Sequence, residues 1–438
     1  MNGDVMLAAP GLVRQRFYTS PDPARVLMLP FTPAADLQDG GQAGSARLSR
    51  LVDRVLALDH GTATRQLAEM CDIFGKRHRN APERFEARAE QVTGSFPAHA
   101  VFTSAQRQLI GAYLMLEYSF ESAALFNPSI VLDPDQSGAP DRGCRFILSL
   151  RAVGEGHVSS LTFRSGSLAA NGEVTLDPAA KLASPAAVRS RRSAAGLVEI
   201  ELGFDPAHDI SERVIFPITE TQSNGIEDFR FVEFIDGRTR KFFATYTAYN
   251  GRQIRSELIE TEDFVTFRMS TLGGAAARNK GMALFPRRID GRYAMIGRQD
   301  AENLYLIFSD DLRSWDEGVL ILKPTFPWEV VQVGNCGSPI ELDEGWLLFT
   351  HGVGPMRNYS IGAVLLDKHD PSKIIARSRE PLLRPGPEER KGYVPNVVYS
   401  CGAMRHNSHI ILPYAIADTF STFATIKIDT LLATLDGA

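Results

Sequence analysis

The sequence predicts an all-β protein, a five-bladed β-propeller with an added N-terminal helical region. Residues 46–95 are rich in Ala, Leu, Arg and Glu at helical spacing, with no strand-like alternation. From about residue 100 the chain changes to short β-branched and aromatic runs broken by Gly, Asn, Asp and Pro. These runs repeat at about the length of a four-stranded blade. We therefore expect residues 1–100 to form an arm and helical region, and residues 101–438 to form the propeller.

The helical pattern is clearest in "ARLSRLVDRVLALDH". Its apolar positions fall on one helix face: Leu48, Leu51, Val52, Val55 and Leu56. The stretch before it, residues 19–45, is punctuated by Pro and Gly and predicts an irregular arm laid on the body. This apolar face is equally consistent with a helical region that caps the propeller and with one that packs against another subunit. The sequence therefore leaves open whether the protein forms a homo-oligomer.

Five strand-like segments share one pattern, with apolar residues at the start and polar residues at the end. They are "FILSLRA" from Phe146, "FFATYTA" from Phe242, "YAMIGRQ" from Tyr293, "WLLFTHG" from Trp346 and "IILPYAI" from Ile410. Each of the last four precedes an Asp-containing turn segment: "TEDFVTF", "SDDLRSW", "LDKHDPSKI" and "IDTLLATL". The number of residues between the first and second segments is nearly double that between the others, which leaves room for an insertion at residues 167–196. The alternative fold on this pattern is a β-sandwich.

Composition narrows the class of protein. A net charge of −5 and a pI near 6.0 give no nucleic-acid footprint, and we expect the one basic cluster, Arg189–Arg192, to be a solvated loop. No apolar stretch is long enough to span a membrane, and the N-terminus lacks the pattern of a secretory signal. Four widely spaced cysteines fit reduced thiols that pack in the core. These features predict a cytoplasmic protein without nucleic-acid or membrane partners.

Charged residues stand where the repeated strands end, which is where propellers carry function. Arg151, Arg298, His351 and Asp418 lie at or just past such strand ends, and "GIEDFR" lies near the start of another blade. Any one of them alone is more simply a surface residue or an Asx cap. Their equivalent positions favour convergence on one polar funnel. Such a funnel suits a sugar, which needs dense hydrogen bonding, and an anion, which needs guanidinium groups.

Several motifs together resemble family 130 of the glycoside hydrolases, the β-mannoside phosphorylases and their hydrolytic relatives. They are "GIEDFR", "ALFPRRIDGRYAMIGR", "SDDLRSW", "GSPIELDEGWLLFTHGV", "YSIGAVLLDKHDPSKIIARSREPLLRP", "GYVPNVVYSCGA" and "YAIADT", in the family's order. The resemblance runs from Phe126 to Thr419. It implies a five-bladed propeller, inversion at the anomeric carbon, and cleavage of β-linked mannosides by phosphate or water with no cofactor. The helical N-terminal region is an extension relative to the compact members of the family.

The resemblance also implies residue roles. The general acid is the Asp of the family's G-[IV]-E-D-P-R motif, here Asp228, which in the phosphorylases acts through a sugar hydroxyl. Glu227 and Arg230 would fix its geometry or bind mannose. Asp418 of "ADT" matches a sugar-binding Asp, and Asn127 of "FNPS" matches a polar residue near the mannose. The chain departs from the motif at Phe229, where the family usually has Pro, which changes the local backbone but not the acid.

Phosphate and water make different demands on the site. An inverting phosphorylase needs cations for its anion, and those matching the family's phosphate contacts are Arg151, Arg298 and His351, together with Tyr359. An inverting hydrolase needs a second carboxylate to activate water. Phosphorylases commonly have Lys in "PPIKT", whereas this chain has "SPIEL" with Glu341. Glu341 is thus either the base of a hydrolase or a structural partner of Arg298 or Arg164.

The retained cations favour phosphorolysis, which yields mannose 1-phosphate with inorganic phosphate as co-substrate and a small oligosaccharide as the other reactant. Glu155, His157 and Arg164 follow Arg151 closely in the sequence. Their segment either supplies the cation that the phosphate site lacks or forms an ordinary hairpin. We expect no metal site, because "HNSH" at residues 406–409 lacks an acidic or Cys partner and reads as a hairpin loop. The alternatives are hydrolysis, a glycan- or protein-binding propeller without turnover, and sugar transfer from a sugar phosphate.

Overall fold

The computed structural model describes residues 8–33, 45–92, 101–194 and 197–437. The chain divides into two compact units. The larger unit comprises Met1–Asp22, Glu121–Ala179 and Pro185–Ala438, and the smaller comprises Pro23–Phe120 and Ala180–Ser184. The sequence placed the boundary at residue 100, whereas this division ends the main segment of the smaller unit at Phe120 and assigns the chain up to Asp22 to the larger unit. Among the described residues, none of the helices is both long and apolar enough to cross a membrane.

The smaller unit carries helices α1 to α4 and a two-stranded sheet. The helices are α1 (Ser45–Leu56), α2 (His60–Phe74), α3 (Ala81–Gln91) and α4 (Ser104–Tyr113), and the strands are β2 (Val26–Pro30) and β3 (Met115–Ser119). Thr103 and Gln106 form a capping box at the start of α4. Leu109, Ile110 and Leu114 then pack on α1, which explains why this apolar run belongs to the helical unit and not to the first strand.

The larger unit is built from groups of consecutive antiparallel strands. The first group is β4 (Ala124–Leu132), β5 (Cys144–Val153), β6 (Ser159–Leu168) and β7 (Val174–Leu176). The second is β12 (Gly225–Asp236), β13 (Thr239–Tyr249), β14 (Ile254–Thr261) and β15 (Thr266–Thr271). The third is β16 (Ala283–Leu284), β17 (Tyr293–Gly297), β18 (Leu304–Ser309) and β19 (Val319–Leu322).

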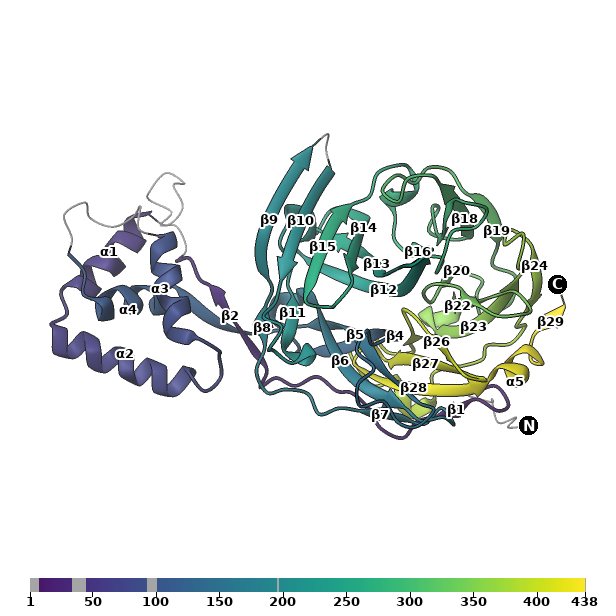
Figure 1. The fold of residues 1–438 in the computed structure, drawn as a ribbon, viewed down its shortest axis with the longest axis horizontal. Helices are drawn as coiled ribbons and strands as arrows, with labels where there is room; N and C mark the ends of the chain where they lie inside the picture. The colour runs from purple at the N-terminus through teal and green to yellow at the C-terminus, as the bar shows by residue number, and fades with distance from the viewer. Residues whose placement is uncertain (1–7, 34–44, 93–100, 195–196, 438) are drawn as a thin grey trace. The chain divides into compact units, whose positions relative to one another are not determined.

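Two further groups complete the unit. The fourth is β20 (Gln332–Asn335), β22 (Trp346–Val353), β23 (Tyr359–Leu366) and β24 (Ile374–Arg377), with β21 (Ile340–Glu341) and β29 (Asp436–Gly437) added. The fifth is β25 (Val398–Tyr399), β27 (His409–Ile416) and β28 (Phe420–Lys427), with β26 (Met404–His406) and β1 (Val13–Arg14) added. The predicted mostly-β chain is confirmed. Figure 1 shows the groups following one another in chain order around a common centre.

Buried side chains join each strand group to the next. Phe163 and Phe231 share a cluster between the first and second groups, and Trp315 lies in the cluster between the second and third. Trp346 belongs to the cluster between the third and fourth groups, and fifth-group Ala415 packs with first-group residues. A further cluster joins the fourth group to the fifth, so buried side chains connect each group to the next and the last to the first.

The five predicted strand segments are confirmed, and each lies in the second strand of its group: β5, β13, β17, β22 and β27. The predicted Asp turns form after β14, β18 and β23, where Asp263, Asp311 and Asp367 accept backbone N–H bonds two residues on. The fourth predicted turn is wrong, because "IDTLL" forms the short helix α5 (Ile428–Leu432).

The insertion between the first and second groups contains β8 (Ser184–Pro185), β9 (Ala187–Ala194), β10 (Leu197–Gly203) and β11 (Arg213–Ile215). Strand β10 pairs with β15, and β9 pairs with β10, so the second group gains two strands at its outer edge. The expectation of a loop at Arg189–Arg192 is wrong, since these residues lie in β9. Exposed arginines on an edge strand discourage further strand pairing.

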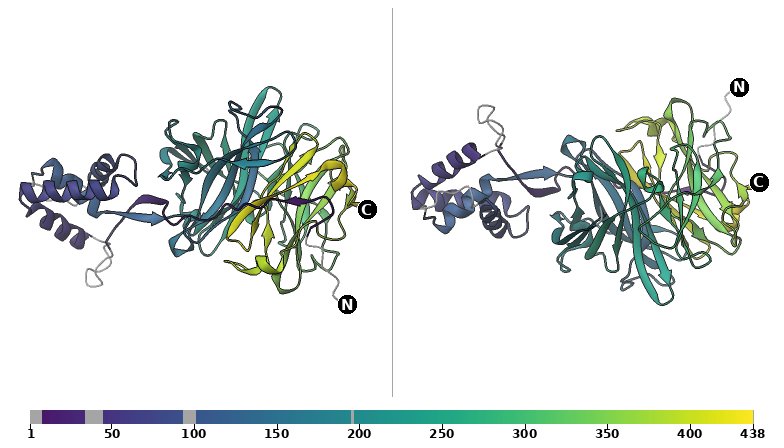
Figure 2. Two further views of the ribbon diagram at one scale, coloured as in Figure 1. Left: turned by 90° about the horizontal axis from the view of Figure 1, so that it is seen from below. Right: turned by 90° about the horizontal axis from the view of Figure 1, so that it is seen from above.

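The N-terminal strand β1 belongs to the larger unit although it precedes the helices. Val13 pairs with Thr425 and Arg14 with Ala424 of β28. The Arg14 side chain donates to the Tyr414 hydroxyl at 2.8 Å and pairs with Glu389. In Figure 2 the purple N-terminal segment runs against the yellow C-terminal strands. An N-terminal segment of this unit and its strand β28 thereby belong to one sheet.

Replacing Trp346 with Ala tests the packing between the third and fourth groups. The indole is fully buried, lies 5.1 Å from the Phe285 ring, and donates to the Lys368 carbonyl at 3.1 Å. Its removal leaves a cavity and should lower the free energy of unfolding by about 3–5 kcal/mol, measured by urea denaturation. The control Val319→Ala, on an exposed outer strand, should change it by about 0.5 kcal/mol or less. Equal effects of the two substitutions would contradict the packing described.

Candidate active site

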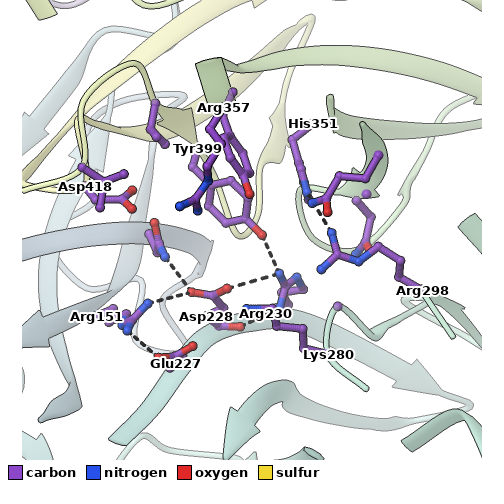
Figure 3. A pocket seen from close by; sticks show the side chains of 18 residues that line it. Arg151, Glu227, Asp228, Arg230, Lys280, Arg298, His351, Arg357, Tyr399 and Asp418 are labelled. Carbon is purple, nitrogen blue, oxygen red and sulfur yellow. Dashed lines mark hydrogen bonds and ion pairs between the residues drawn. The ribbon is translucent and has the colours of Figure 1, made fainter. Parts of the chain in front are cut away.

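One polar cavity of about 220 Å³ lies where the strand groups converge. Its lining comes from every group and from the segments between them. The residues are Asn127, Arg151, Glu227, Asp228, Arg230, Lys280, Gly281, Arg298, Gln332, Gly334, Asn335, His351, Arg357, Tyr359, Val394, Val397, Tyr399 and Asp418. Every site residue predicted from the sequence lies here except Glu341. Figure 3 shows the labelled side chains pointing toward one another around Asp228.

Two β-bulges aim the central polar pair into the cavity. Strand β4 shifts register between Phe126 and Ser129, and β12 shifts between Glu227 and Arg230. Asn127 and Asp228 occupy the bulges with left-handed φ values of 49° and 57°. The Asn127 amide donates to Asp228 Oδ1 at 2.6 Å. Asn and Asp tolerate this backbone conformation better than most residues, so the strained geometry explains the residue types as well as their positions.

Phe229, the departure from the family motif, faces away from the cavity. Its ring stacks on Tyr246 with a centroid distance of 4.6 Å and an interplanar angle of 12°. The Tyr246 hydroxyl donates to the buried Glu257 at 2.7 Å, and Gln222 also donates to Glu257. The side chain after Asp228 is therefore held in an aromatic and hydrogen-bonded shell, which fixes the bulge from behind.

Arginines hold the carboxylates in place. Arg151 Nη2 lies 2.6 Å from Glu227 Oε1, and its Nη1 lies 3.6 Å from Asp228 Oδ1. Arg230 is buried; its Nη2 lies 3.7 Å from Asp228 Oδ2 and donates to the Tyr399 hydroxyl at 2.8 Å. Arg151 thus contacts Glu227 and Asp228 directly, although the family resemblance placed it among the phosphate contacts.

The two aspartates of the cavity differ in protonation. Burial alone would raise the pKa of Asp228, but Arg230, Arg151, Lys280 and the Asn127 hydrogen bond together hold that pKa below its usual range. Burial raises the pKa of Asp418 to about 7 despite the opposing charge of Arg151, with Asp228 adding to the rise. In the free chain Asp228 is therefore ionised, while Asp418 is partly protonated near neutral pH.

The cations on the other side of Asp228 form a separate cluster. Arg298 Nη1 lies 3.4 Å from His351 Nε2, and Figure 3 shows this pair across Asp228 from Asp418 and Arg151. Burial, with Arg298 and Arg230 nearby, lowers the pKa of His351 well below its usual value, so its ring is neutral. Tyr359 stacks beside the His351 ring at 5.8 Å. The cluster offers guanidinium and imidazole groups to an anion.

The sequence reasoning missed several lining residues, among them Lys280, Arg357, Tyr399, Gln332 and Asn335. Lys280 and Arg357 lie outside the strands, so strand-end positions did not reveal them. Tyr399 belongs to the quoted motif "GYVPNVVYSCGA" and was a signal that could have been used. With Lys280 and Arg357 the cavity carries more cations than the sequence predicted.

Glu341, expected either as the base of a hydrolase or as a structural partner of Arg298 or Arg164, lies outside the cavity lining. Glu341 forms a two-pronged ion pair with Arg287, with both N···O distances at 2.8 Å. In strand register Glu341 pairs with Trp346, at the opposite end of β22 from His351. Five residues of extended strand separate Trp346 from His351, a distance of about 16 Å. Nor is Arg164 its partner, because Arg164 pairs with the buried Glu121.

Two other predicted features are placed outside the cavity lining. "HNSH" forms the β26–β27 hairpin, with His406 paired to His409, as expected. Among the described residues, three or more His, Cys, Asp or Glu side chains nowhere gather as a metal site would require. His157 lies in the exposed turn between β5 and β6, where its Nδ1 is 2.8 Å from the Tyr393 hydroxyl.

Comparison with known proteins agrees with the resemblance noted in the sequence. The sequence model of the family described as beta-1,4-mannooligosaccharide phosphorylase, glycoside hydrolase family 130, matches residues 191–437. The chain belongs to this family. Asn127 and Arg151 precede the matched range, although they line the same cavity.

Individual relatives give the same assignment. The 1,2-beta-oligomannan phosphorylase of Thermoanaerobacter sp. (strain X514) is 37% identical over 48% of this chain and 70% of that protein. The beta-1,2-mannobiose phosphorylase of Listeria innocua serovar 6a is 29% identical over 51% of this chain and 63% of its own length. A solved structure of a Listeria innocua beta-1,2-mannobiose phosphorylase superposes with a TM-score of 0.51 and 24% identity. That superposition covers 71% of this chain and 92% of the other and supports the fold.

The raised pKa of Asp418 predicts a specific pH dependence of stability. A folded-state pKa of about 7 means that the folded chain binds this proton more tightly than the unfolded chain does. The resulting stabilisation is complete below about pH 4 and is lost as the pH rises through about 7. Urea unfolding midpoints of the wild type should therefore fall relative to those of Asp418→Asn between these values, and run parallel above them. A constant difference across that range would contradict the assignment.

Proposed function

We propose that this chain is an inverting β-mannoside phosphorylase. Inorganic phosphate cleaves a β-linked mannoside to give mannose 1-phosphate and a shortened sugar. The observation that carries the proposal is the separation of charge within one cavity, with carboxylates around Arg151 on one side and Lys280, Arg298 and His351 on the other. The relatives named as phosphorylases of 1,2-beta-oligomannan and beta-1,2-mannobiose support this class of substrate.

The carboxylate side suits the mannose unit. Asp228, Asn127, Glu227 and Asp418 offer acceptors and donors at close spacing, as a sugar with several hydroxyls requires. Arg151 orients Glu227 and Asp228, and Arg230 orients Asp228 from the other side. These arginines are positioning residues that keep the carboxylates fixed while the sugar binds.

The cation side suits a phosphate dianion. Arg298 supplies a guanidinium fork, Lys280 a point charge, and His351 and Tyr359 further hydrogen-bonding groups. A phosphate oxygen held there attacks the anomeric carbon as the bond from that carbon to the leaving oxygen breaks. The proton from Asp228 reaches the leaving oxygen, directly or through a mannose hydroxyl. One displacement inverts the anomeric configuration and balances atoms and charge.

Asp228 must gain a proton before it can act as an acid, because the surrounding cations keep it ionised in the free chain. Binding of phosphate supplies negative charge beside Lys280 and Arg230, which offsets their effect and raises the affinity of Asp228 for a proton. Phosphate in this account is both the nucleophile and the group that prepares the acid.

Hydrolysis is the weaker alternative. An inverting hydrolase needs a carboxylate base on the face of the sugar opposite the acid. The carboxylates of the described cavity lining are Glu227, Asp228 and Asp418, and all three act electrostatically on Arg151. Glu341, the base expected for hydrolysis, is paired with Arg287 away from the cavity. The side facing the cations therefore lacks the group that would activate water.

We also propose that the five strand groups are the blades of a five-bladed propeller. The core clusters shared by successive groups, including the last and the first, support this arrangement. In this arrangement β4 and β12 are inner strands, and their bulges place Asn127 and Asp228 at the central funnel.

Matched carboxylate substitutions test the assignment of the acid. Asp228→Asn should lower kcat for phosphorolysis of β-1,2-mannobiose by about 10³-fold, since general acid catalysis is lost. Glu341→Gln should leave kcat within about threefold, because it only weakens a surface ion pair. Release of mannose 1-phosphate is the readout, on a panel of β-1,2- and β-1,4-linked mannosides with and without phosphate.

Three results would overturn parts of this account. Free mannose released at the same rate without phosphate, together with loss of activity in Glu341→Gln, would establish the hydrolase. Full activity in Asp228→Asn with loss in Asp418→Asn would transfer the acid role to Asp418. Ligand binding without any turnover by the wild type would favour the glycan-binding propeller.

Substitution of the lysine tests the phosphate side separately. Lys280→Met should raise the KM for phosphate by about tenfold to a hundredfold, the effect of losing one charge-assisted contact. The KM for mannobiose should change little, because Lys280 lies on the cation side. Arg287→Met, which removes a cation outside the cavity lining, is the control and should leave both constants unchanged. An equal rise in both KM values for Lys280→Met would argue against separate subsites.

A further inference from the structure

We propose that Tyr393, supported by His157, forms the binding site for the leaving sugar at the mouth of the cavity. The inference rests on the proposed phosphorolysis and adds the residues that recognise the second sugar. The ligand that this site would bind is a pyranoside, with the C–H face of the sugar stacked on the tyrosine ring.

The direction of displacement places the leaving sugar on the carboxylate side. In a single displacement, nucleophile and leaving group lie on opposite faces of the anomeric carbon. Phosphate on the cluster of Lys280, Arg298 and His351 therefore sends the leaving sugar toward Asp418 and Arg151, which Figure 3 shows across Asp228. The rim above that side must contact the second sugar.

Tyr393 is tied to the segment that carries Asp418. The Tyr393 N–H donates to Thr419 Oγ1 at 2.7 Å, and the Val394 N–H donates to the Ala417 carbonyl at 2.9 Å. Val394 and Asp418 both line the cavity, whereas the Tyr393 side chain is 44% exposed. The phenol therefore lies at the rim beside the carboxylates, with its position fixed by backbone hydrogen bonds.

His157 reaches the same place from the first strand group. It follows β5, the strand that carries Arg151, and its Nδ1 lies 2.8 Å from the Tyr393 hydroxyl. The two rings are 5.7 Å apart with an interplanar angle of 39°. Together they make an exposed aromatic pair, and such amphipathic rings bury the apolar face of a ligand while their polar atoms take hydrogen bonds. His157 Nε2 would form a hydrogen bond with a hydroxyl group of the bound sugar.

The backbone of the His157 turn has a counterpart that already serves the cavity. The β5–β6 turn has left-handed φ values at Gly156 (67°) and His157 (60°), and the β22–β23 turn has them at Met356 (58°) and Arg357 (52°). Arg357 lines the cavity from its turn. Left-handed conformations at non-glycine residues are strained and persist where the surrounding structure holds them, as it does at several residues of the cavity. By this equivalence His157 is aimed at the rim as Arg357 is aimed at the interior.

Kinetics in both directions test the inference. Tyr393→Ala should raise the KM for β-1,2-mannobiose about tenfold or more in phosphorolysis. In synthesis it should raise the KM for the acceptor sugar equally, and leave the KM for mannose 1-phosphate and for phosphate within about twofold. Tyr393→Phe, which keeps the ring and loses the bond to His157, should recover most of the affinity. His157→Ala should lie between the two.

Tyr293→Ala serves as the control, because Tyr293 is another partly exposed tyrosine but begins β17, at the opposite end of that strand from Arg298. It should leave all three constants unchanged. Unchanged acceptor KM in Tyr393→Ala, or a matching rise in the KM for mannose 1-phosphate, would overturn the inference and leave the phosphorylase standing. If the wild type shows no turnover, the proposed function fails. Calorimetry with β-1,2-mannobiose still tests the inference in that case: weaker binding by Tyr393→Ala than by the wild type would support it, and equal affinity would overturn it.

Discussion

The arginines on either side of Asp228 are the interaction on which the rest of the site depends. A carboxylate in this buried position would be costly without compensation, and Arg151 and Arg230 both lie within 4 Å of it. Each arginine has a second anchor, Glu227 for Arg151 and the Tyr399 hydroxyl for Arg230. Because these anchors come from different strand groups, the charge balance of the site also links the groups around the centre.

The same constraint explains the separation of the cavity into two sides. Arg151 pairs with Glu227 and, together with Arg230, offsets the charge of Asp228, which leaves Arg298 on the other side available for an incoming anion. Neutral His351 adds hydrogen-bonding capacity without further charge. In the proposed mechanism, bound phosphate offsets the remaining positive charge and allows Asp228 to hold a proton. Acid, nucleophile and leaving group thereby receive separate places in a cavity of small volume.

Much of this arrangement was predictable from the sequence, because the chemistry lies at strand ends. The repeated strands located Arg151, Arg298, His351 and Asp418, and the family motif located Asp228, the proposed acid. Lys280 and Arg357 were not predictable in the same way, because residues outside the strands are placed by tertiary packing. Glu341 was misplaced because its sequence neighbours do not reveal which end of β22 it pairs with, and the register with Trp346 decides that. The boundary at residue 120 was missed because the apolar run of α4 fits helix and strand patterns alike.

The configuration of the sugar phosphate formed in the first turnovers tests the central claim most directly. Proton and phosphorus NMR of a reaction between β-1,2-mannobiose and inorganic phosphate would follow the anomeric signal before any equilibration. A cavity with one acid and a phosphate held on the opposite face predicts α-mannose 1-phosphate as the first product, with no free mannose beyond the leaving sugar. β-Mannose 1-phosphate, which requires a double displacement, or two equivalents of free mannose, which requires attack by water, would contradict it.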